Sequence, residues 1–384
     1  MKSHLMMPAG LFAMLLTAAM STGSTLLFVL AIMVALTVFV CLISVIWASA
    51  TVRITAEIED QTVYRGEHTT LVLGVSHGGW IPVAPVILEI PSMSGGDSRK
   101  IRLKDIPGRV QSLRMPIDAA HVGIYTSGIQ TCMIEDMLGM FQRAIRPDET
   151  VYSLTVLPRV FDVDPLVMAP GDPGSELMAR ANEDLNAPSD IRAYQPGDAM
   201  KKIHWKLSAR KQELIVRKFE EPLLQEVLIL MDCSRPPFHG DSKAEADIRD
   251  TLLETAASLF SAQMRTDHEI RMPLTGSRPA EADRSIGTTI ALKYLAGVDF
   301  SETDRFERVL QMESSRMSKV GCVAVVTARL NYAMVDIMTR IHRTGPNLRL
   351  YLVTSTPEDA NVLPLISRLQ HSEIEVAYVT PNAG

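Results

Sequence analysis

The amino-terminal stretch is the feature that most restricts how this chain can fold. From Ser3 to Val52 the sequence contains no Asp, Glu, Lys or Arg, a run far longer than the roughly 20 apolar residues that one bilayer crossing requires. Residues 21–24 form its one polar, turn-prone interruption. We therefore predict a hairpin of two membrane-spanning helices within residues 1–50, at about 5–20 and 25–47.

Two observations bear on the side of the membrane that the rest of the chain occupies. A hairpin that retains both helices leaves the two chain ends on one side. The four cysteines are widely spaced, without a CxxC pair, which is typical of ordinary thiols in a reducing compartment. We predict a multi-pass protein with cytoplasmic soluble parts. A signal peptide is the alternative, because Lys2 precedes the apolar stretch and residues 18–20 loosely resemble a cleavage site.

The rest of the chain is long enough for two soluble domains, since 384 residues exceed one ordinary domain. The hydrophobic fraction of 47% is concentrated at the start, in keeping with a membrane hairpin. A net charge of −6 argues against whole-surface attraction to nucleic acid, because such binding needs clustered Lys and Arg to neutralise phosphates. We expect no nucleic-acid partner.

Residues 51–164 are predicted to form an all-β, Ig-like sandwich module. Apolar and polar residues alternate at 52–58 as in a half-buried strand, and the segments 69–75 and 86–90 are further strand candidates. Glycine-containing turns recur between strand segments at the spacing typical of sandwiches and barrels. We interpret Asp136 and Gly139 as turn-forming residues, because this part of the sequence contains no catalytic constellation.

The segment 165–175 contains a Pro-Gly-Asp-Pro-Gly run and is interpreted as a linker, beyond which residues 176–384 alternate strand and helix. An apolar run at 227–231 is typical of a parallel strand buried on both faces. We predict a doubly wound α/β sheet, which binds ligands at the carboxyl ends of its strands. The other expected elements are strands at about 320–327, 348–354 and 374–379, and helices at about 243–265, 286–296, 304–316, 332–343 and 358–370.

The segment 192–220 of the α/β domain carries more potential chemistry than any other. Turn-forming residues open it, and the Lys and Arg side chains that follow outnumber the acidic ones. We expect Trp205 to contribute to stability through its apolar area. A solvated basic loop is the alternative interpretation. The residues predicted to bind a partner are Arg192, Tyr194, Gln195, Pro196, Gly197, Asp198, His204, Trp205, Lys206, Ser208, Arg210 and Arg217.

This pattern, together with the residue types at 203, 209, 214, 216 and 219–220, closely resembles the signature of the bacterial proteins catalogued as domain of unknown function 58. The resemblance extends upstream to 123–125 and 135–141. It implies a protein of the inner (cytoplasmic) membrane, with a pair of membrane helices, a β-sandwich and a von Willebrand A-like α/β domain. It also implies association with MoxR-type AAA+ ATPases.

The resemblance further implies a metal site at the end of the first strand of the α/β domain, with Asp232, Ser234 and Thr327 as ligands. The sequence departs from that pattern, because Pro236 has no hydroxyl to offer and Ala328 stands where an acidic residue is expected. A hard divalent ion needs an oxygen-rich shell, so we expect a degraded site with no cofactor, or weak Mg²⁺ binding at most. Alternatively, Asp232 and Ser234 cap the turn after the strand.

Two classes of function stay open. The first, which the resemblance favours, is a membrane-anchored, non-enzymatic interaction or assembly protein that works with a MoxR-type AAA+ ATPase. The second is an enzyme acting on an anionic or cell-envelope substrate, with His204 as acid or base. Attraction of the basic patch to anionic lipid is a third, weaker idea. Signatures of nucleotide hydrolysis, dinucleotide binding and zincin chemistry are absent, and the S-x-x-K match at 208–211 lacks its partner motifs.

Overall fold

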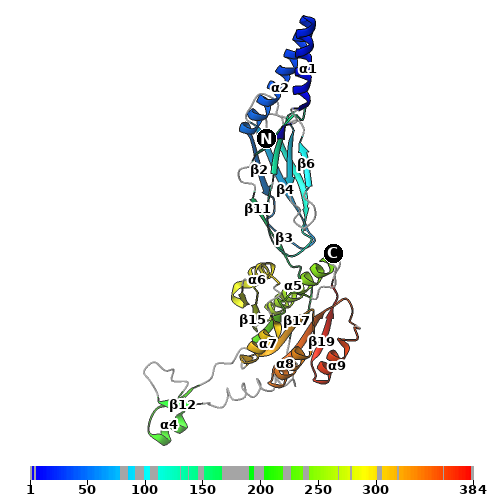
Figure 1. Ribbon diagram of the computed structural model, residues 1–384. Coiled ribbons are helices and arrows are strands. Elements are labelled where there is room, and N and C mark those ends of the chain that lie inside the picture. Colours follow the sequence, from blue (N-terminus) through cyan, green and yellow to red (C-terminus); the bar gives the residue numbers. More distant parts are fainter. Residues whose placement is uncertain are drawn as a thin grey trace. The chain divides into compact units, whose positions relative to one another are not determined.

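The computed structural model divides into two compact units, Met1–Val156 and Leu157–Gly384 (Figure 1). The predicted multidomain organisation is confirmed at this level. The residues described are 2–3, 6–77, 85–90, 99–103, 111–129, 131–136, 138–145, 151–166, 190–193, 203–218, 226–236, 242–266, 268–276, 279–300, 305–317, 320–357 and 359–381.

The division between the units falls ahead of the predicted linker at 165–175. The segment that follows the division already belongs to the second unit, since the Phe161 N–H donates to Ser258 Oγ of helix α5 (Ser242–Met264) at 3.0 Å. Most of the predicted linker lies outside the described residues. Buried polar side chains on α5 thus hold the incoming chain, a role that an apolar pattern could not indicate.

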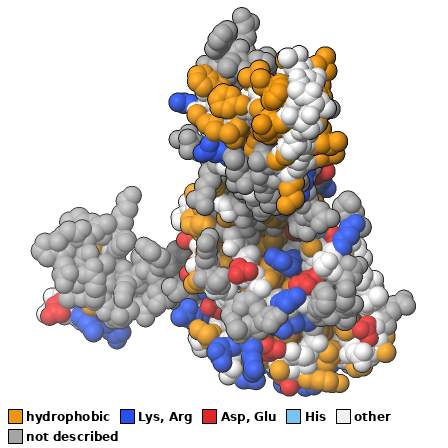
Figure 2. Space-filling view, turned by 45° about the horizontal axis from the view of Figure 1, so that its top comes forward, with side chains coloured by type: hydrophobic (Ala, Val, Ile, Leu, Met, Phe, Trp, Pro, Cys, Tyr) orange, Lys and Arg blue, Asp and Glu red, His pale blue; other side chains and the backbone are white. Residues whose placement is uncertain are grey.

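Two apolar helices, α1 (Met6–Thr22) and α2 (Thr25–Thr51), begin the first unit. Gly23, with a φ of +63°, turns the chain between them. Among the described helices α2 is long and apolar enough to cross a membrane, whereas α1 is a shorter apolar helix. Apolar side chains cover the outside of these helices, as the upper part of Figure 2 shows in orange. Such a surface is unfavourable in water, and α2 therefore supports membrane attachment.

Both ends of the helical hairpin meet the β module. At its start, strand β1 (Lys2–Ser3) pairs antiparallel with β10 (Phe141–Ile145). At its end, α2 passes directly into β2 (Val52–Ile58), with no residue between helix and strand. The hairpin is therefore attached to the β module at two places.

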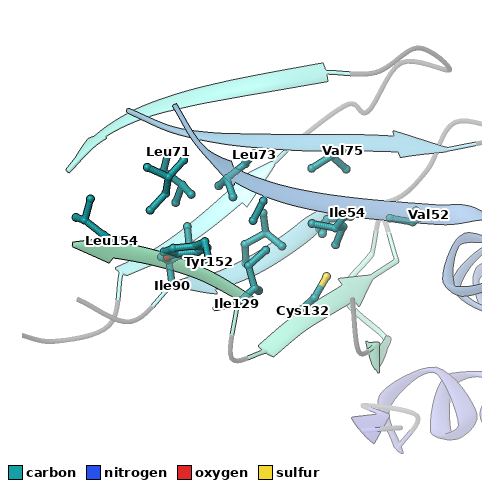
Figure 3. Close-up of a cluster of buried hydrophobic side chains, with 14 of the residues drawn as sticks. Val52, Ile54, Leu71, Leu73, Val75, Ile90, Ile129, Cys132, Tyr152 and Leu154 are labelled. Carbon is teal, nitrogen blue, oxygen red and sulfur yellow. The ribbon is translucent and has the colours of Figure 1, made fainter. Parts of the chain in front are cut away.

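The described strands of the β module form three sheets with the strand orders β2-β4-β7, β1-β10-β9-β5-β6 and β3-β11-β8. Side chains alternate between buried and exposed along β2, as the predicted half-buried strand requires. The buried side chains, among them Ile54, Leu73, Cys132 and Leu154, form one core (Figure 3). The other strands are β3 (Thr62–Tyr64), β4 (His68–His77), β5 (Val86–Ile90), β6 (Arg99–Leu103), β7 (Gln111–Asp118), β8 (Gly123–Gly128), β9 (Thr131–Glu135) and β11 (Val151–Leu157).

The turn between β9 and β10 is built around the buried carboxylate of Asp136. Its two oxygens accept hydrogen bonds from the Phe141 N–H at 2.6 Å and the Leu138 N–H at 3.1 Å. Gly139, with a φ of +70°, closes the turn by donating its N–H to the Asp136 carbonyl at 3.0 Å. The interpretation of Asp136 and Gly139 as turn-forming residues is confirmed. Phe141 packs against Val45, so the turn also supports the end of α2.

We expect Asp136→Ala to lower the free energy of unfolding of the first unit by about 2–4 kcal/mol, because the buried Phe141 N–H and the partly buried Leu138 N–H lose a charged acceptor. Thermal unfolding of the full chain in detergent measures the effect. Asp118→Ala is the matched control, since that carboxylate is exposed and pairs only with exposed His68 among the described residues. Equal melting of the two variants would contradict the role given to Asp136.

The second unit contains a six-stranded sheet of order β16-β15-β14-β17-β18-β19, in which the pairs from β15 to β19 are parallel and β16 runs antiparallel. The chain order reverses between β14 and β17, so their carboxyl ends form a switch point, where such sheets bind ligands. The strands are β14 (Glu226–Met231), β15 (Glu269–Leu274), β16 (Ala280–Asp283), β17 (Val320–Thr327), β18 (Asn347–Val353) and β19 (Glu375–Val379).

Helices cover both faces of this sheet. Buried side chains of α7 (Phe306–Ser314), α8 (Tyr332–Arg343) and α9 (Leu363–His371) pack with Leu228 and Leu230 on one face. On the other face α5 contacts the central strands, and α6 (Gly287–Ala296) contacts α5. The described elements therefore agree with a doubly wound α/β arrangement. The von Willebrand A-like and Ig-like names for the two domains stay predictions.

Candidate functional site

The described part of the region around the segment 192–220 is a short helix held against a two-stranded sheet. Strands β12 (Asp190–Ala193) and β13 (Ile215–Lys218) pair antiparallel, and helix α4 (Trp205–Lys211) lies between them in the sequence. Backbone pairing places Arg192 and Arg217 on this sheet, but their side chains are not among the described features. The predicted residues 194–198 lie outside the described residues.

The inner side of α4 is fixed to β13 through Ser208. The buried Ser208 hydroxyl accepts a hydrogen bond from the Ile215 N–H at 2.9 Å. The His204 N–H donates to the Ile215 carbonyl at 2.8 Å, and His204 Nδ1 caps the helix by accepting from the Leu207 N–H at 3.4 Å. Ser208 and His204 thus orient the helix, and the Ser208 hydroxyl is directed away from solvent.

The outer side of α4 is exposed and combines an indole with two cations. Trp205 is 62% exposed, and Lys206, Ala209 and Arg210 are also exposed. We call these four residues the α4 face. The expectation that Trp205 contributes its apolar area to the core does not fit this exposure, because most of the indole contacts solvent. Sequence reasoning missed this because a helix this short shows which residues share a side but not what covers them.

A second group of predicted residues, Asp232, Ser234 and Thr327, comes together at the carboxyl ends of β14 and β17. Arg329 joins them, and we call these four residues the Asp232 cluster. Asp232 Oδ1 accepts hydrogen bonds from the N–H and the hydroxyl of Ser234, the first at 3.0 Å. Asp232 Oδ2 accepts from Thr327 Oγ1 at 2.8 Å and from Arg329 Nε at 3.0 Å. Arg329 Nη2 also donates to Ser234 Oγ. The structure therefore places the three predicted ligand residues in contact.

Burial makes the charge balance of this cluster important. The Asp232, Ser234 and Thr327 side chains are almost fully buried, while the Arg329 side chain is 33% exposed. A buried carboxylate without a cation is strongly disfavoured, and the Arg329 guanidinium supplies that cation as an ion pair. Arg329 was not predicted, because the expected metal site was defined by oxygen ligands alone. An arginine two residues after Thr327 was the available signal.

The surroundings of Arg329 continue the polar network. The Asn331 side chain caps α8 by accepting from the Met334 N–H at 2.9 Å and donates to Glu307 Oε1 at 2.6 Å. Burial raises the pKa of Glu307, but the Asn331 hydrogen bond and the nearby Arg329 charge outweigh it and leave that pKa below its usual value. Glu307 is therefore an acidic neighbour of Arg329.

A match to a known protein family covers both of these groups of residues. Residues 190–344 match the model of a family described as "Protein of unknown function DUF58", which confirms the resemblance and includes both the α4 face and the Asp232 cluster. The Bacillus subtilis "Uncharacterized protein YeaD" is 26% identical over 139 residues, which cover 35% of this chain and 34% of that protein. The alignment thus spans about a third of that relative's length.

Solved structures add little. The CARDB domain of a Pyrococcus furiosus protein is 12% identical, with a TM-score of 0.21, over 27% of this chain and 91% of that one. A cohesin module from a Clostridium perfringens glycoside hydrolase is 10% identical, with a TM-score of 0.22, over 28% of this chain and 96% of that one. Scores of this size do not establish a shared fold.

Proposed function

We propose, from the match of residues 190–344 to a family of unknown function and from the exposed α4 face, that this chain is a membrane-anchored, non-enzymatic assembly protein that binds a partner protein through that face. The observation that carries the proposal is the exposure of Trp205 beside Lys206 and Arg210. Trp and Arg are enriched at the centres of protein interfaces, where they contribute most of the binding energy.

The partner surface must be acidic and offer an apolar pocket, because the α4 face presents two cations around an indole. The resemblance drawn from the sequence proposes a MoxR-type AAA+ ATPase as that partner. The enzyme alternative gains no support from the described residues. Ser208 is buried against Ile215, and His204 Nδ1 is engaged at the start of α4, so neither is arranged as a nucleophile with its base.

Charge reversal on the α4 face tests this proposal. We expect Lys206→Glu combined with Arg210→Glu to abolish copurification of an AAA+ ATPase from detergent-solubilised membranes, identified by mass spectrometry, without a change in melting temperature. Exposed charges contribute about 0–1 kcal/mol to folding, so the variant should fold normally. Lys293→Glu, on the exposed side of α6, is the matched control. Unchanged recovery of the ATPase with the double variant would refute docking at the α4 face.

The proposed location is the inner membrane, with α1 and α2 both spanning it and the soluble parts in the cytoplasm. The length and hydropathy of α2 support one crossing. Pairing of β1 with β10 supports a hairpin that returns to the side from which it started. A cytoplasmic location would also give an ATPase access to the α4 face.

Cysteine labelling in spheroplasts tests this topology, provided that the labelled cysteine is introduced. All four native cysteines are buried, and burial raises the pKa of Cys132 to about 12, so the parent should react little on either side. We expect a membrane-impermeant maleimide to label Ser21→Cys, exposed in the last turn of α1, in intact spheroplasts. Arg114→Cys, exposed on β7, should react only after the membrane is opened. The reverse pattern would place the soluble parts outside.

A further inference from the structure

The Asp232 cluster occupies the place at which a von Willebrand A-like sheet would hold a divalent metal ion. Its three oxygen-bearing residues converge from two strands, Asp232 and Ser234 after β14 and Thr327 at the end of β17. A hard cation such as Mg²⁺ needs a near-octahedral shell of oxygen atoms. A metal ion can therefore bind here only if these oxygens are available to it.

The Arg329 guanidinium already uses the oxygens that a metal ion would need. It donates to Asp232 Oδ2 through Nε and to Ser234 Oγ through Nη2. Thr327 Oγ1 is also committed, since it donates to Asp232 Oδ2 at 2.8 Å and accepts from the Arg329 N–H at 3.2 Å. A second cation at this place would meet a fixed positive charge within contact distance of its ligands. The residues present do not fit a divalent ion.

We propose that the Arg329 guanidinium is the resident cation of this site, taking the place of a divalent metal ion and excluding one. The Asp232 carboxylate is paired directly with the Arg329 guanidinium, so this ion pair is neutral without any added metal ion. The pair also joins the segment after β14 to the segment after β17, across the switch point of the sheet. These two segments are therefore held together independently of the metal concentration around the protein.

The role of Arg329 is independent of the proposed docking function. The α4 face and the Asp232 cluster share no residue, so loss of partner binding at the first would leave the second untouched. Any ligand or protein that contacts this edge of the sheet meets an arginine in place of a metal ion.

The test follows the melting temperature of the full chain in detergent, with millimolar Mn²⁺ or with EDTA. We expect the parent to melt at the same temperature in both. Arg329→Ala should melt lower by about 5–10 °C in EDTA, because Asp232 loses its cation. It should recover part of this loss in Mn²⁺. The double variant Arg329→Ala/Asp232→Asn should show no such recovery, because the vacated site then has no carboxylate for the ion.

A neighbouring arginine is the matched control. Arg235 also follows β14, but its pair with Glu245, at 2.9 Å, is more exposed. Arg235→Ala should therefore melt close to the parent, and Mn²⁺ should not change its melting temperature. Arg329→Lys, which keeps the charge but loses the planar pair of donors, is the second variant if Arg329→Ala does not fold. The melting temperature of Arg329→Lys should lie below that of the parent. It should lie above that of Arg329→Ala if Arg329→Ala folds.

Three results would overturn the proposal. The first is a parent that is stabilised by Mn²⁺ in a manner that Asp232→Asn abolishes, because the site would then hold metal beside Arg329. The second is an Arg329→Ala variant that melts like Arg235→Ala, because Asp232 would then need no cation. The third is a folded Arg329→Ala variant that Mn²⁺ does not stabilise, because the guanidinium would then not occupy a metal position.

Discussion

Trp205→Ala is expected to weaken binding of the proposed AAA+ partner far more than any other single substitution on the α4 face, and to leave the melting temperature nearly unchanged. An aromatic side chain buries about 150–250 Å² when it is covered, and here most of that burial is still to be gained. A tryptophan at the centre of an interface contributes about 2 kcal/mol or more, which is roughly a 30-fold change in affinity. Titration of the purified ATPase onto the reconstituted protein measures this change.

The control for Trp205 is another exposed aromatic residue of the same unit. Tyr332 is 64% exposed at the start of α8, so Tyr332→Ala removes a similar exposed ring away from α4. We expect it to bind the ATPase like the parent. A Trp205→Ala variant that melts well below the parent would show that the indole packs inside the protein. A variant that binds normally would exclude the α4 face as the docking site.

Asp232→Ala is expected to give the largest loss of stability, about 3–5 kcal/mol, because it leaves the Arg329 charge two-thirds buried and removes the acceptor of the Thr327 hydroxyl. In a unit of this size the melting temperature should fall by about 10 °C. The outer edge of Arg329 is in contact with solvent, which places the loss nearer the lower figure. Differential scanning calorimetry of the full chain measures the shift.

An exposed pair of the same chemistry provides the comparison for Asp232. Asp336 and Arg368 lie 2.6 Å apart with both side chains about half exposed, so Asp336→Ala should cost about 0–1 kcal/mol. A double-mutant cycle adds a second check. Asp232→Ala and Arg329→Ala together should cost less than the sum of their separate effects, because the double variant leaves neither charge unpaired. Additive costs would mean that the two side chains do not stabilise each other.

The central strands and the surrounding helices were predictable from sequence because their signals are local. The apolar runs of β14 and β17 are buried along almost their whole length, as two-sided burial requires. Helix α8 begins and ends where the pattern placed it, since Asn331 caps its start and basic residues occupy its last turn.

Strand β15 was missed because its sequence carries two residues that argue against a strand. Arg271 is charged, yet it lies half-buried in ion pairs with Glu226 and Glu313. Pro273 has no N–H, but the parallel ladder with β14 ends at Arg271, so no ladder bond to β14 is lost. Both explanations depend on neighbours that are distant in sequence.

The candidate site was likewise predictable where the signal is local, and not where it depends on contacts between distant residues. The convergence of Asp232, Ser234 and Thr327 follows from strand ends that meet at one edge of the sheet. The role of Arg329 does not follow from strand order, because it depends on which side chain neutralises a carboxylate once that carboxylate is buried. The exposure of Trp205 likewise depends on what the rest of the fold leaves uncovered.

Because α2 passes directly into β2, the apolar helix and the β module are joined without a flexible linker. Thr51 ends the helix and Val52 begins the strand, and Phe141 packs against Val45, about 1.7 turns before Thr51. A helix and a strand joined in this way pass rotation from one to the other. If α2 spans a bilayer, as its length and hydropathy support, a change in its tilt would pass directly to the β module, because no linker separates α2 from β2.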